Sequence, residues 1–494
     1  MVYQGIIINR ALLKEYYQKK HYKGALSMKL HNIEFEVKHK PVLDQDFIPL
    51  YKFNQGFLKG ATKPLKIALE RTDGQTYVFD TFVREEEEYN KANQYYIERM
   101  VKAILWCVGG FRLTICGDRK LGEYIKAAYS STGIRAFDYK TMSVIYEKEF
   151  SVDYKELEDA PEPFESSKPI GRNLEGYRIG FDAGGSDRKV SAVINGKSVF
   201  SEEVVWHPKM ESDPTYHYNE IVTALKRAAK EMPRVDAIGV SSAGIYVDNR
   251  TMVASLFKRV SEEDFNNHVK DIYIRAGKEI GDVPIEVCND GDVTALAGAM
   301  SLEDTKILGI AMGTSEAGGY VDGDGNVKGW LNELAFMPCD AQKQASFDEW
   351  SGDIGCGVKY FSQDAVIKLA SKVGIDLKEN LSPGEKLKLI QEMKDKDGYI
   401  NGVEKIYKTI GAYLGHSLAY YSTFYDMKHV LLMGRVTSGE GGEIIVDVAK
   451  KVLEDEYSEL ATKIKLQLPD EKSRRVGQSV AAASLPIVMT KPSI

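Results

Sequence analysis

Four short segments of the chain place glycines, hydroxyls or carboxylates directly after an apolar run. They are residues 182–186 (Asp-Ala-Gly-Gly-Ser), 289–290 (Asn-Asp), 313–315 (Gly-Thr-Ser) and 434–439 (Gly-Arg-Val-Thr-Ser-Gly). Glycines let a backbone approach phosphate groups closely, and a carboxylate at the end of a strand can hold hydrated Mg²⁺ or accept a proton. Open α/β sheets bind nucleotides at this end of their strands. The four segments together predict a site that holds a nucleotide beside the group that it phosphorylates.

The first segment reads as a glycine turn between two strands. Apolar residues at 178–181 run into it, and residues 190–194 resume as a second strand across a hairpin. Asp182 suits a water-mediated hold on Mg²⁺, and the backbone and hydroxyl groups of the turn suit phosphate, at Gly184, Gly185 and Ser186. A Gly-Gly hairpin alone is an ordinary turn, so this assignment depends on the companion segments.

The second segment joins a strand to a helix. Residues 285–288 form an apolar strand that delivers Asn289 and Asp290, and the small residues 293–300 continue as a helix. An Asp in this place can simply cap the helix, because its carboxylate accepts from free N–H groups of the first turn.

In this order, the segments resemble the ATP-binding core of the ROK (repressor, open reading frame, kinase) family, sugar kinases of the actin-like ATPase superfamily. The resemblance covers roughly residues 177–490. It implies an α/β fold with a two-lobed, duplicated ribonuclease-H-like core, the first lobe at 177–300 and the second at 301–494. It also implies ATP and Mg²⁺ as cofactors and a sugar or polyol as acceptor.

The resemblance assigns roles to individual residues. Asp290 is implied as the general base, in preference to a helix cap. Residues 313–315 resemble the second phosphate loop (Gly313, Thr314, Ser315), and residues 434–439 the adenosine loop (Gly434, Gly439). The residues implied to lie at the sugar are Ser242, Gly244, Asn289 and Glu333. Glu316 stands where the family commonly has an apolar residue, so it points away from phosphate or contacts the substrate.

The zinc motif of the family is incomplete. ROK enzymes commonly show Glu-x-Gly-His, then Cys-x-Cys-Gly-x-x-Gly-Cys with a Glu two residues on, and the His and cysteines hold zinc. Here Phe336 replaces the His, Glu349 and Ser351 replace two cysteines, Cys356 remains, and Val358 replaces the second sugar-facing Glu. A structural zinc site needs about four N or S ligands. We therefore expect no zinc and an altered sugar pocket.

A proline-rich stretch separates this core from the residues upstream. Three of the fifteen prolines, Pro161, Pro163 and Pro169, fall between residues 159 and 169, which predicts a linker at 161–176. Residues 1–160 are predicted to form an accessory α+β domain without a nucleotide loop, metal spacing or catalytic cluster. Its expected elements are strands at 33–37, 75–82, 105–116 and 142–150 and helices at 85–103 and 121–129.

Composition narrows the setting and the partners. The 494 residues exceed a single core, and no run of about 18 apolar residues or N-terminal leader pattern occurs, so a cytoplasmic protein without a membrane partner is expected. The net charge of −7 disfavours broad nucleic-acid binding. Lysines interleaved with Tyr16, Tyr17 and Tyr22 could suggest nucleic-acid contact, but a solvated face is the preferred interpretation, and no helix-turn-helix pattern is present.

These features predict a ROK-type carbohydrate kinase that phosphorylates a sugar or sugar-like hydroxyl with ATP. Two alternatives remain. A non-catalytic sugar or nucleotide sensor on the same fold would not need Asp290. An actin-like ATPase coupled to a partner should tolerate loss of Asn289 and Glu333. The sequence leaves open the acceptor, the role of residues 1–160 and the oligomeric state, for which a homodimer is one alternative.

Overall fold

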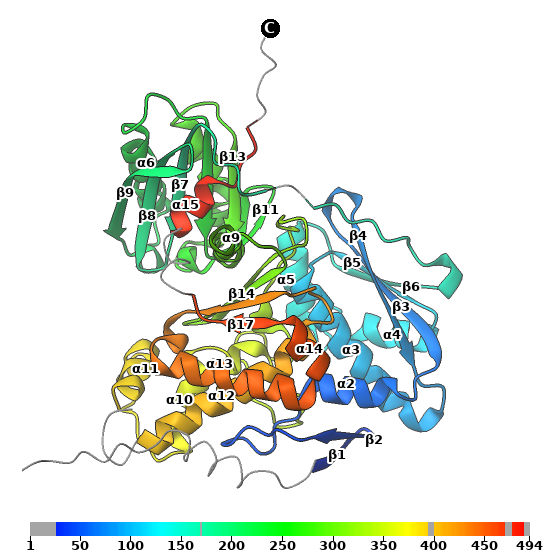
Figure 1. Cartoon of the computed structure of the whole chain (residues 1–494). Helices are drawn as coiled ribbons and strands as arrows, with labels where there is room; N and C mark the ends of the chain where they lie inside the picture. Colours follow the sequence, from blue (N-terminus) through cyan, green and yellow to red (C-terminus); the bar gives the residue numbers. More distant parts are fainter. Residues whose placement is uncertain (1–25, 168–169, 394–399, 470–476, 489–494) are drawn as a thin grey trace, which may run out of the picture.

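The computed structural model describes residues 26–167, 170–393, 400–469 and 477–488. Tyr16, Tyr17 and Tyr22 lie outside these residues. The described strands form one five-stranded sheet, two four-stranded sheets and two short ribbons, and Figure 1 shows the three larger sheets in separate parts of the molecule. None of the described helices is long and apolar enough to cross a membrane.

The five-stranded sheet and its helices form the first lobe. Its strand order is β13-β10-β7-β8-β9, in which β7, β8 and β9 are antiparallel neighbours and β10 and β13 run parallel to β7. This is the strand order of a ribonuclease-H-like sheet. The strands are β7 (Tyr177–Ala183), β8 (Asp187–Ile194), β9 (Lys197–Val205), β10 (Ala237–Ser242) and β13 (Ile285–Asn289). The lobe also holds α6 (Pro214–Ala229), α7 (Glu262–Asp264), α8 (Ile272–Lys278) and the ribbon β11 (Ile245–Val247) with β12 (Arg250–Val253).

The second lobe repeats this order around a four-stranded sheet. β14 pairs with β15 in antiparallel fashion, and β16 and β17 follow in parallel on the other side. The chain therefore has the expected α/β fold, a two-lobed actin-like ATPase core, with one strand fewer in the second sheet. The strands are β14 (Ile307–Met312), β15 (Glu316–Val321), β16 (His429–Met433) and β17 (Lys465–Gln467).

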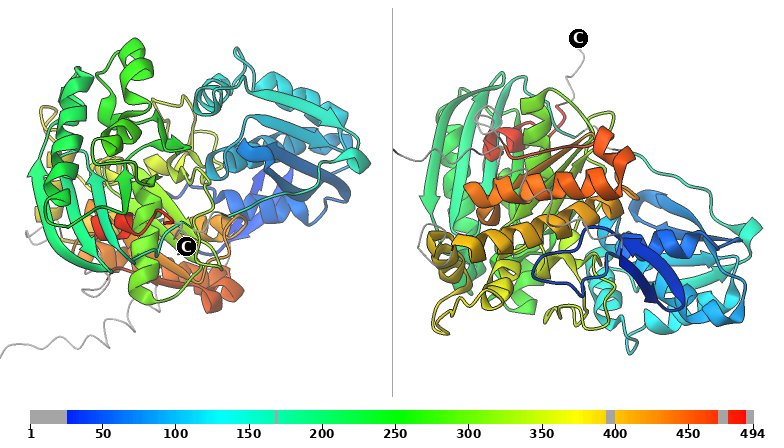
Figure 2. Two further views of the ribbon diagram at one scale, coloured as in Figure 1. Left: turned by 90° about the horizontal axis from the view of Figure 1, so that it is seen from above. Right: turned by 60° about the horizontal axis from the view of Figure 1, so that its bottom comes forward.

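Long helices cover the second sheet. α12 and α13 lie side by side across it (Figure 2). α11 begins with a capping box, in which Ser382 and Glu385 satisfy each other's backbone N–H groups. The helices of this lobe are α10 (Gln363–Ser371), α11 (Pro383–Glu392), α12 (Ile400–Tyr421), α13 (Glu440–Glu456) and α14 (Ser458–Lys463).

Helix α9 (Asp290–Leu302) ties the lobes together. It starts at the end of β13 in the first lobe and packs on β14 and β15 of the second. Close packing requires glycine here, because a Cβ on Gly291 would clash with the Gly318 carbonyl and one on Gly319 would clash with Gly291. The start of α9, and with it Asp290, therefore lies between the two sheets.

The C-terminal helix α15 (Gln478–Ala483) corrects the predicted extent of the second lobe. It packs on β7 and β10 of the first sheet, and the Ser479 hydroxyl lies 2.7 Å from that of Ser191 on β8. Residues 301–494 are thus not one unit, because the chain returns to cover an open face of the first sheet with a run of small residues.

The N-terminal region, residues 26–160, is α+β as expected. Two predicted strands are wrong in their first residues. Residues 105–107 end helix α3, and residues 142–146 end helix α5, since Met142, Ile145 and Tyr146 share one buried helix face. The sheet order is β4-β3-β5-β6. The strands are β1 (Leu26–Leu30), β2 (Ile33–Val37), β3 (Lys63–Glu70), β4 (Thr76–Val83), β5 (Arg112–Cys116) and β6 (Ser151–Lys155), and the helices are α2 (Leu50–Leu58), α3 (Asn90–Cys107), α4 (Arg119–Ala128) and α5 (Ala136–Tyr146).

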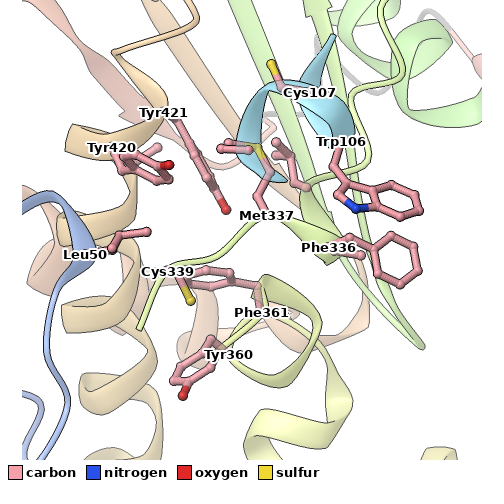
Figure 3. Packing of buried hydrophobic residues seen from close by; sticks show 14 of the residues in the cluster. Leu50, Trp106, Cys107, Phe336, Met337, Cys339, Tyr360, Phe361, Tyr420 and Tyr421 are labelled. Atoms are coloured by element: carbon pink, nitrogen blue, oxygen red, sulfur yellow. The ribbon is translucent and has the colours of Figure 1, made fainter. Parts of the chain in front are cut away.

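This region shares its core with the second lobe. Leu50, Trp106 and Cys107 pack in one buried cluster with Met337 and Tyr421 of the second lobe (Figure 3). The region is therefore held by apolar burial, which is the main favourable term in folding. We keep residues 161–176 as the proposed linker, since its described part holds neither helix nor strand.

Candidate active site

We call residues 182–186 the first loop, residues 313–315 the second loop and residues 434–439 the third loop. The second and third loops lie next to each other at the ends of β14 and β16. Residues 313–315 form a tight turn between β14 and β15, closed by a hydrogen bond from the Gly313 N–H to the Ser315 carbonyl (2.9 Å). Gly434 follows β16 with φ of +98°, and a Cβ there would clash with the Met312 carbonyl at the end of β14. Only glycine fits both constraints, so it brings the predicted adenosine loop against the predicted phosphate loop.

A cavity of about 850 Å³ opens beside the third loop. Gly434 and Gly439 line it together with Thr294 of α9 and Gln478 of α15. The Gln478 amide nitrogen donates to the Asp290 carbonyl (2.9 Å) and to the Thr294 hydroxyl (2.9 Å), so this wall of the cavity is continuous with the start of α9. This volume is within the usual range of ligand pockets, and the cavity is large enough for a nucleoside.

Asp182 is the second-last residue of strand β7 and is buried. The Ser241 hydroxyl donates to Asp182 Oδ1 at 2.8 Å, whereas no described residue donates to its Oδ2. Burial, and then the charge of Asp290, raise the pKa of Asp182 to about 6. The free carboxylate oxygen is placed to accept a hydrogen bond from a water molecule bound to Mg²⁺. This ion prefers oxygen ligands and usually retains several waters.

The first loop is fixed by a tryptophan that the sequence prediction did not include. The indole N–H of Trp206 donates to the Gly184 carbonyl (2.8 Å), and its backbone N–H donates to the Ser186 carbonyl (3.2 Å). Gly185 lies between these anchored residues. Trp206 directly follows the edge strand β9. In the sequence, the sign of this role is a tryptophan just after a strand-like segment.

Asn289 is the N-cap of α9. Its Oδ1 accepts from the Gly291 N–H (2.7 Å), and its Nδ2 donates to the Gly244 carbonyl (2.6 Å). The predicted turn around Gly244 is thereby brought to the start of the helix. Since Asn289 is the cap, Asp290 is the first helical residue and stands one position inside.

Asp290 at the start of α9 and Glu333 of the second lobe are both partly exposed, and they lie near enough for the charge of Asp290 to act on Glu333. Burial raises the pKa of Asp290, which the Gly291 N–H and the positive charge of Lys209 partly offset. Burial and the charges of Asp290 and Asp292 raise the pKa of Glu333 to about 8. A carboxyl group with a pKa near 8, as at Glu333, can hold and release a proton near neutral pH, and the pKa of Asp290 is shifted in the same direction.

Ser242 is not brought to this site. Its hydroxyl is fully buried and lies 2.8 Å from the Tyr273 hydroxyl. Its neighbour Ser241 instead holds Asp182, because the two residues are paired across the parallel strands β10 and β7. Successive side chains of a strand point to opposite faces of the sheet. The register of β10 against β7 therefore decides which serine faces the site, and the register cannot be determined from the sequence.

Glu316 points into the interior, away from the second loop. It is 2% exposed, its Oε1 accepts from the Tyr421 hydroxyl at 3.2 Å, and its Oε2 has no hydrogen-bond partner among the described residues. Burial, and then the charge of Glu333, raise its pKa to about 8. Of the two alternatives, Glu316 pointing away from phosphate is the one that the structure adopts, and its burial leaves no side-chain surface for a contact with substrate.

Because Glu316 is buried, we expect the stability of the protein to depend on pH, and we expect Glu316→Gln to weaken that dependence. The folded protein keeps a proton on Glu316 up to about pH 8, whereas an unfolded Glu loses it near pH 4.5. Its contribution is thus fully present below pH 4.5 and lost as pH rises through 8, with a slope of at most about 1.4 kcal/mol per pH unit. Denaturant unfolding at pH 5, 6.5 and 8 should show the variant gaining stability relative to the parent as pH rises. Parallel curves would contradict this, and the exposed Glu263→Gln is the control.

The residues at the family's zinc positions have other partners. Phe336 packs against Trp106 of α3, with ring centroids 4.1 Å apart. Glu349 pairs with Lys359 at 2.6 Å, and the Ser351 hydroxyl donates to Asp348. Within the described part of the chain, no three His, Cys, Asp or Glu side chains gather in a way that could hold a metal ion.

A buried ionic cluster joins the N-terminal region to the loop that carries these positions. Lys102 of α3 is fully buried and lies 3.0 Å from Asp138 and 3.2 Å from Asp353. Arg99 and Arg135 also contact Asp353, at 3.0 and 2.7 Å. Burial alone would raise the pKa of Asp353, but the charges of Arg99 and Lys102 hold it below its usual value.

A second cavity, of about 250 Å³, lies where the N-terminal region meets both lobes. Arg71 and Tyr146 of the N-terminal region line it, together with Gly244, Asn289 and Asp292. Asp290 and Glu333 do not line it. This cavity therefore does not include the two carboxyl groups of the candidate active site.

No protein-family model matches this chain, and no curated protein matches it in sequence. The fold is similar to that of solved ROK structures. A ROK family glucokinase from Streptomyces griseus, in complex with glucose and AMPPNP, is 20% identical, with a TM-score of 0.47 over 63% of this chain and 99% of the glucokinase. The ROK hexokinase from Thermus thermophilus is 18% identical, with a TM-score of 0.47 over 62% and 97% of the two chains. A ROK family transcriptional regulator, a homolog of the E. coli MLC protein, is 15% identical, with a TM-score of 0.48 over 63% and 79%. These likenesses concern the fold alone.

Proposed function

We propose that the protein transfers a phosphoryl group from ATP to a hydroxyl group of a sugar or sugar-like molecule. The observation that carries this proposal is the placement of Asp290. It is not the cap of α9, it lies between the lobes with a raised pKa, and it is within electrostatic reach of Asp182 and Glu333. A base with a pKa shifted toward neutral is what proton removal from a hydroxyl requires. The proposed setting is the cytoplasm, which the five free cysteines support.

Each residue of the candidate site has a proposed role that follows from its position. Asp290 accepts the proton of the acceptor hydroxyl, and Glu333 orients the acceptor from the opposite lobe. The N–H groups of the first loop and those of Thr314 and Ser315 in the second loop bind the phosphates, since the Gly313 N–H already closes the turn, and the third loop with its cavity holds the adenosine. Asp182 would hold Mg²⁺ through water, and the ion, when bound, neutralises charge on the phosphates.

One observation favours the sensor as a second candidate. The Glu333 N–H donates to the Trp106 carbonyl at 2.9 Å, and the Asn332 N–H donates to the Cys107 carbonyl at 2.9 Å. The N-terminal region is thus bonded directly to the residue proposed to meet the acceptor. If Glu333 moved when a ligand bound, these hydrogen bonds would transmit the movement to the N-terminal region without phosphoryl transfer.

A ligand screen tests the proposal. The melting temperature should rise with Mg-AMPPNP, and rise further with one or more monosaccharides, amino sugars or polyols, because a ligand that binds only the folded state adds stability. Acceptors found in this way are then incubated with Mg-ATP, and ADP and the phosphorylated product should form together. ADP without a phosphorylated product would indicate an ATPase. Binding of nucleotide and acceptor with no product would favour the sensor.

A further inference from the structure

Lys209 is a cation placed directly over the first loop. It belongs to a short 3₁₀ helix, Pro208–Met210, that follows strand β9. A Cβ built on Gly185 would lie 3.0 Å from Lys209 Nζ and 3.1 Å from its Cε. The ammonium group therefore lies against the backbone of the glycine that is proposed to meet phosphate.

The segment that carries Lys209 is anchored on both sides. Trp206 is buried and donates to the Gly184 carbonyl, as described above. On the other side of Lys209, the fully buried His217 lies with Nε2 at 2.9 Å from the Pro208 carbonyl. The position of Lys209 is thus set by the same contacts that shape the loop.

This ammonium group has no carboxylate partner in the described part of the chain. Among the described residues, Lys209 forms no ion pair within 4.0 Å and no hydrogen bond through Nζ. Partial burial, and then the nearby charge of Lys258, lower its pKa, while Asp290 raises it and Arg435 of the third loop lowers it. Lys209 therefore lies against Gly185, near enough to Asp290 and to Arg435 of the third loop for their charges to act on it, and its positive charge is available for an anion.

We propose that Lys209 binds the terminal phosphate of the nucleotide and neutralises the charge that develops on it during transfer. The proposal rests on the proposed function and deepens it. In that step the acceptor oxygen bonds to the γ-phosphorus and its proton passes to Asp290. The bond from the γ-phosphorus to the β,γ-bridging oxygen breaks, and its electron pair leaves with ADP. A lysine acts here as a point charge, as lysines do in other phosphate sites.

Lys209→Met tests this, because methionine keeps the apolar stem and removes the charge. We expect kcat to fall about 10- to 100-fold, the usual worth of one hydrogen bond to a charged group. The Kd for Mg-AMPPNP should rise at least about 5-fold, while the Kd for Mg-ADP, which lacks the terminal phosphate, changes less than about 2-fold. Lys209→Arg should restore part of both losses, which a variant that only failed to fold could not show.

Lys258→Met is the matched control, since Lys258 is an exposed neighbour of the same charge. It should change kcat and both Kd values less than about 2-fold. Equal losses in the two methionine variants would overturn the proposal in favour of a diffuse positive field. Equal weakening of Mg-ADP and Mg-AMPPNP, or no change in either, would also overturn it. If the parent protein transfers phosphate to no acceptor, the proposed function fails, and the difference between the two nucleotides still decides the role of Lys209.

Discussion

Asp290→Asn is expected to lower turnover by roughly 10²-fold or more, as loss of a general base usually does. The variant should bind Mg-AMPPNP and the acceptor within about 3-fold of the parent, because the asparagine keeps the size of the side chain and lies outside the nucleotide cavity. Its melting temperature should stay close to that of the parent, since Asn289 caps α9. Turnover is measured by coupling ADP formation to detection of the phosphorylated acceptor found in the ligand screen.

Two comparisons make this test decisive. Asp282→Asn changes an exposed carboxylate in the same lobe and should leave turnover unchanged. Asn289→Asp keeps the oxygen that caps α9 but loses the hydrogen bond that Nδ2 donates to the Gly244 carbonyl, so it should destabilise the start of α9 while leaving Asp290 in place. Unchanged turnover in Asp290→Asn would remove Asp290 as the base. A large loss of stability with proportional loss of binding would instead give it a structural role.

The loops were predictable because each depends on a local pattern. An apolar strand followed by glycine, as at Gly313 and Gly434, predicts a turn at a strand end, and the order of the segments predicts that the turns share one sheet edge. Contacts between segments that are far apart in the chain correspond to no local sequence pattern, so they could not be predicted. Trp206 and Lys209 reach the first loop only because β9 pairs beside β8, and Ser241 faces the site where Ser242 was expected.

The same limit explains the errors outside the site. Residues 142–146 have both strand-like and helix-like apolar spacing, and packing against the rest of the N-terminal region selects the helix. The run of small residues in α15 gave no sign that it would cross back to the first sheet. Lys102, in the middle of α3, reads from the sequence as a solvent-facing residue, whereas the structure buries it completely.

The burial of Lys102 changes the view of the N-terminal region. The region was expected to be a separate accessory domain, yet it contributes to the largest hydrophobic cluster and bonds to the backbone of Glu333. Its charged residues meet Asp353 in the segment where the family commonly has zinc ligands. We infer that this ionic cluster now fixes the segment, and that the core depends on the N-terminal region to keep the acceptor side of the site in place.

Lys102→Met should therefore destabilise the protein by about 3–5 kcal/mol, the usual cost of removing one partner from a buried ionic cluster. Methionine fills the space of the lysine stem, but Asp138 and Asp353 are left short of positive charge in the interior. The loss is measured as the free energy of unfolding in denaturant at pH 7. Acceptor binding should weaken in the same variant, because the segment next to Glu333 loses its anchor.

Lys226→Met provides the comparison. Lys226 forms an ion pair with Glu279 at 2.9 Å, with half of its side chain exposed, and such surface pairs contribute about 0–1 kcal/mol. A double change, Lys102→Met with Asp138→Leu, should recover part of the stability lost in the single variant, since it removes the unpaired charge as well. If Lys102→Met cost no more than Lys226→Met, the cluster would not hold the segment, and the N-terminal region would be attached by its apolar contacts alone.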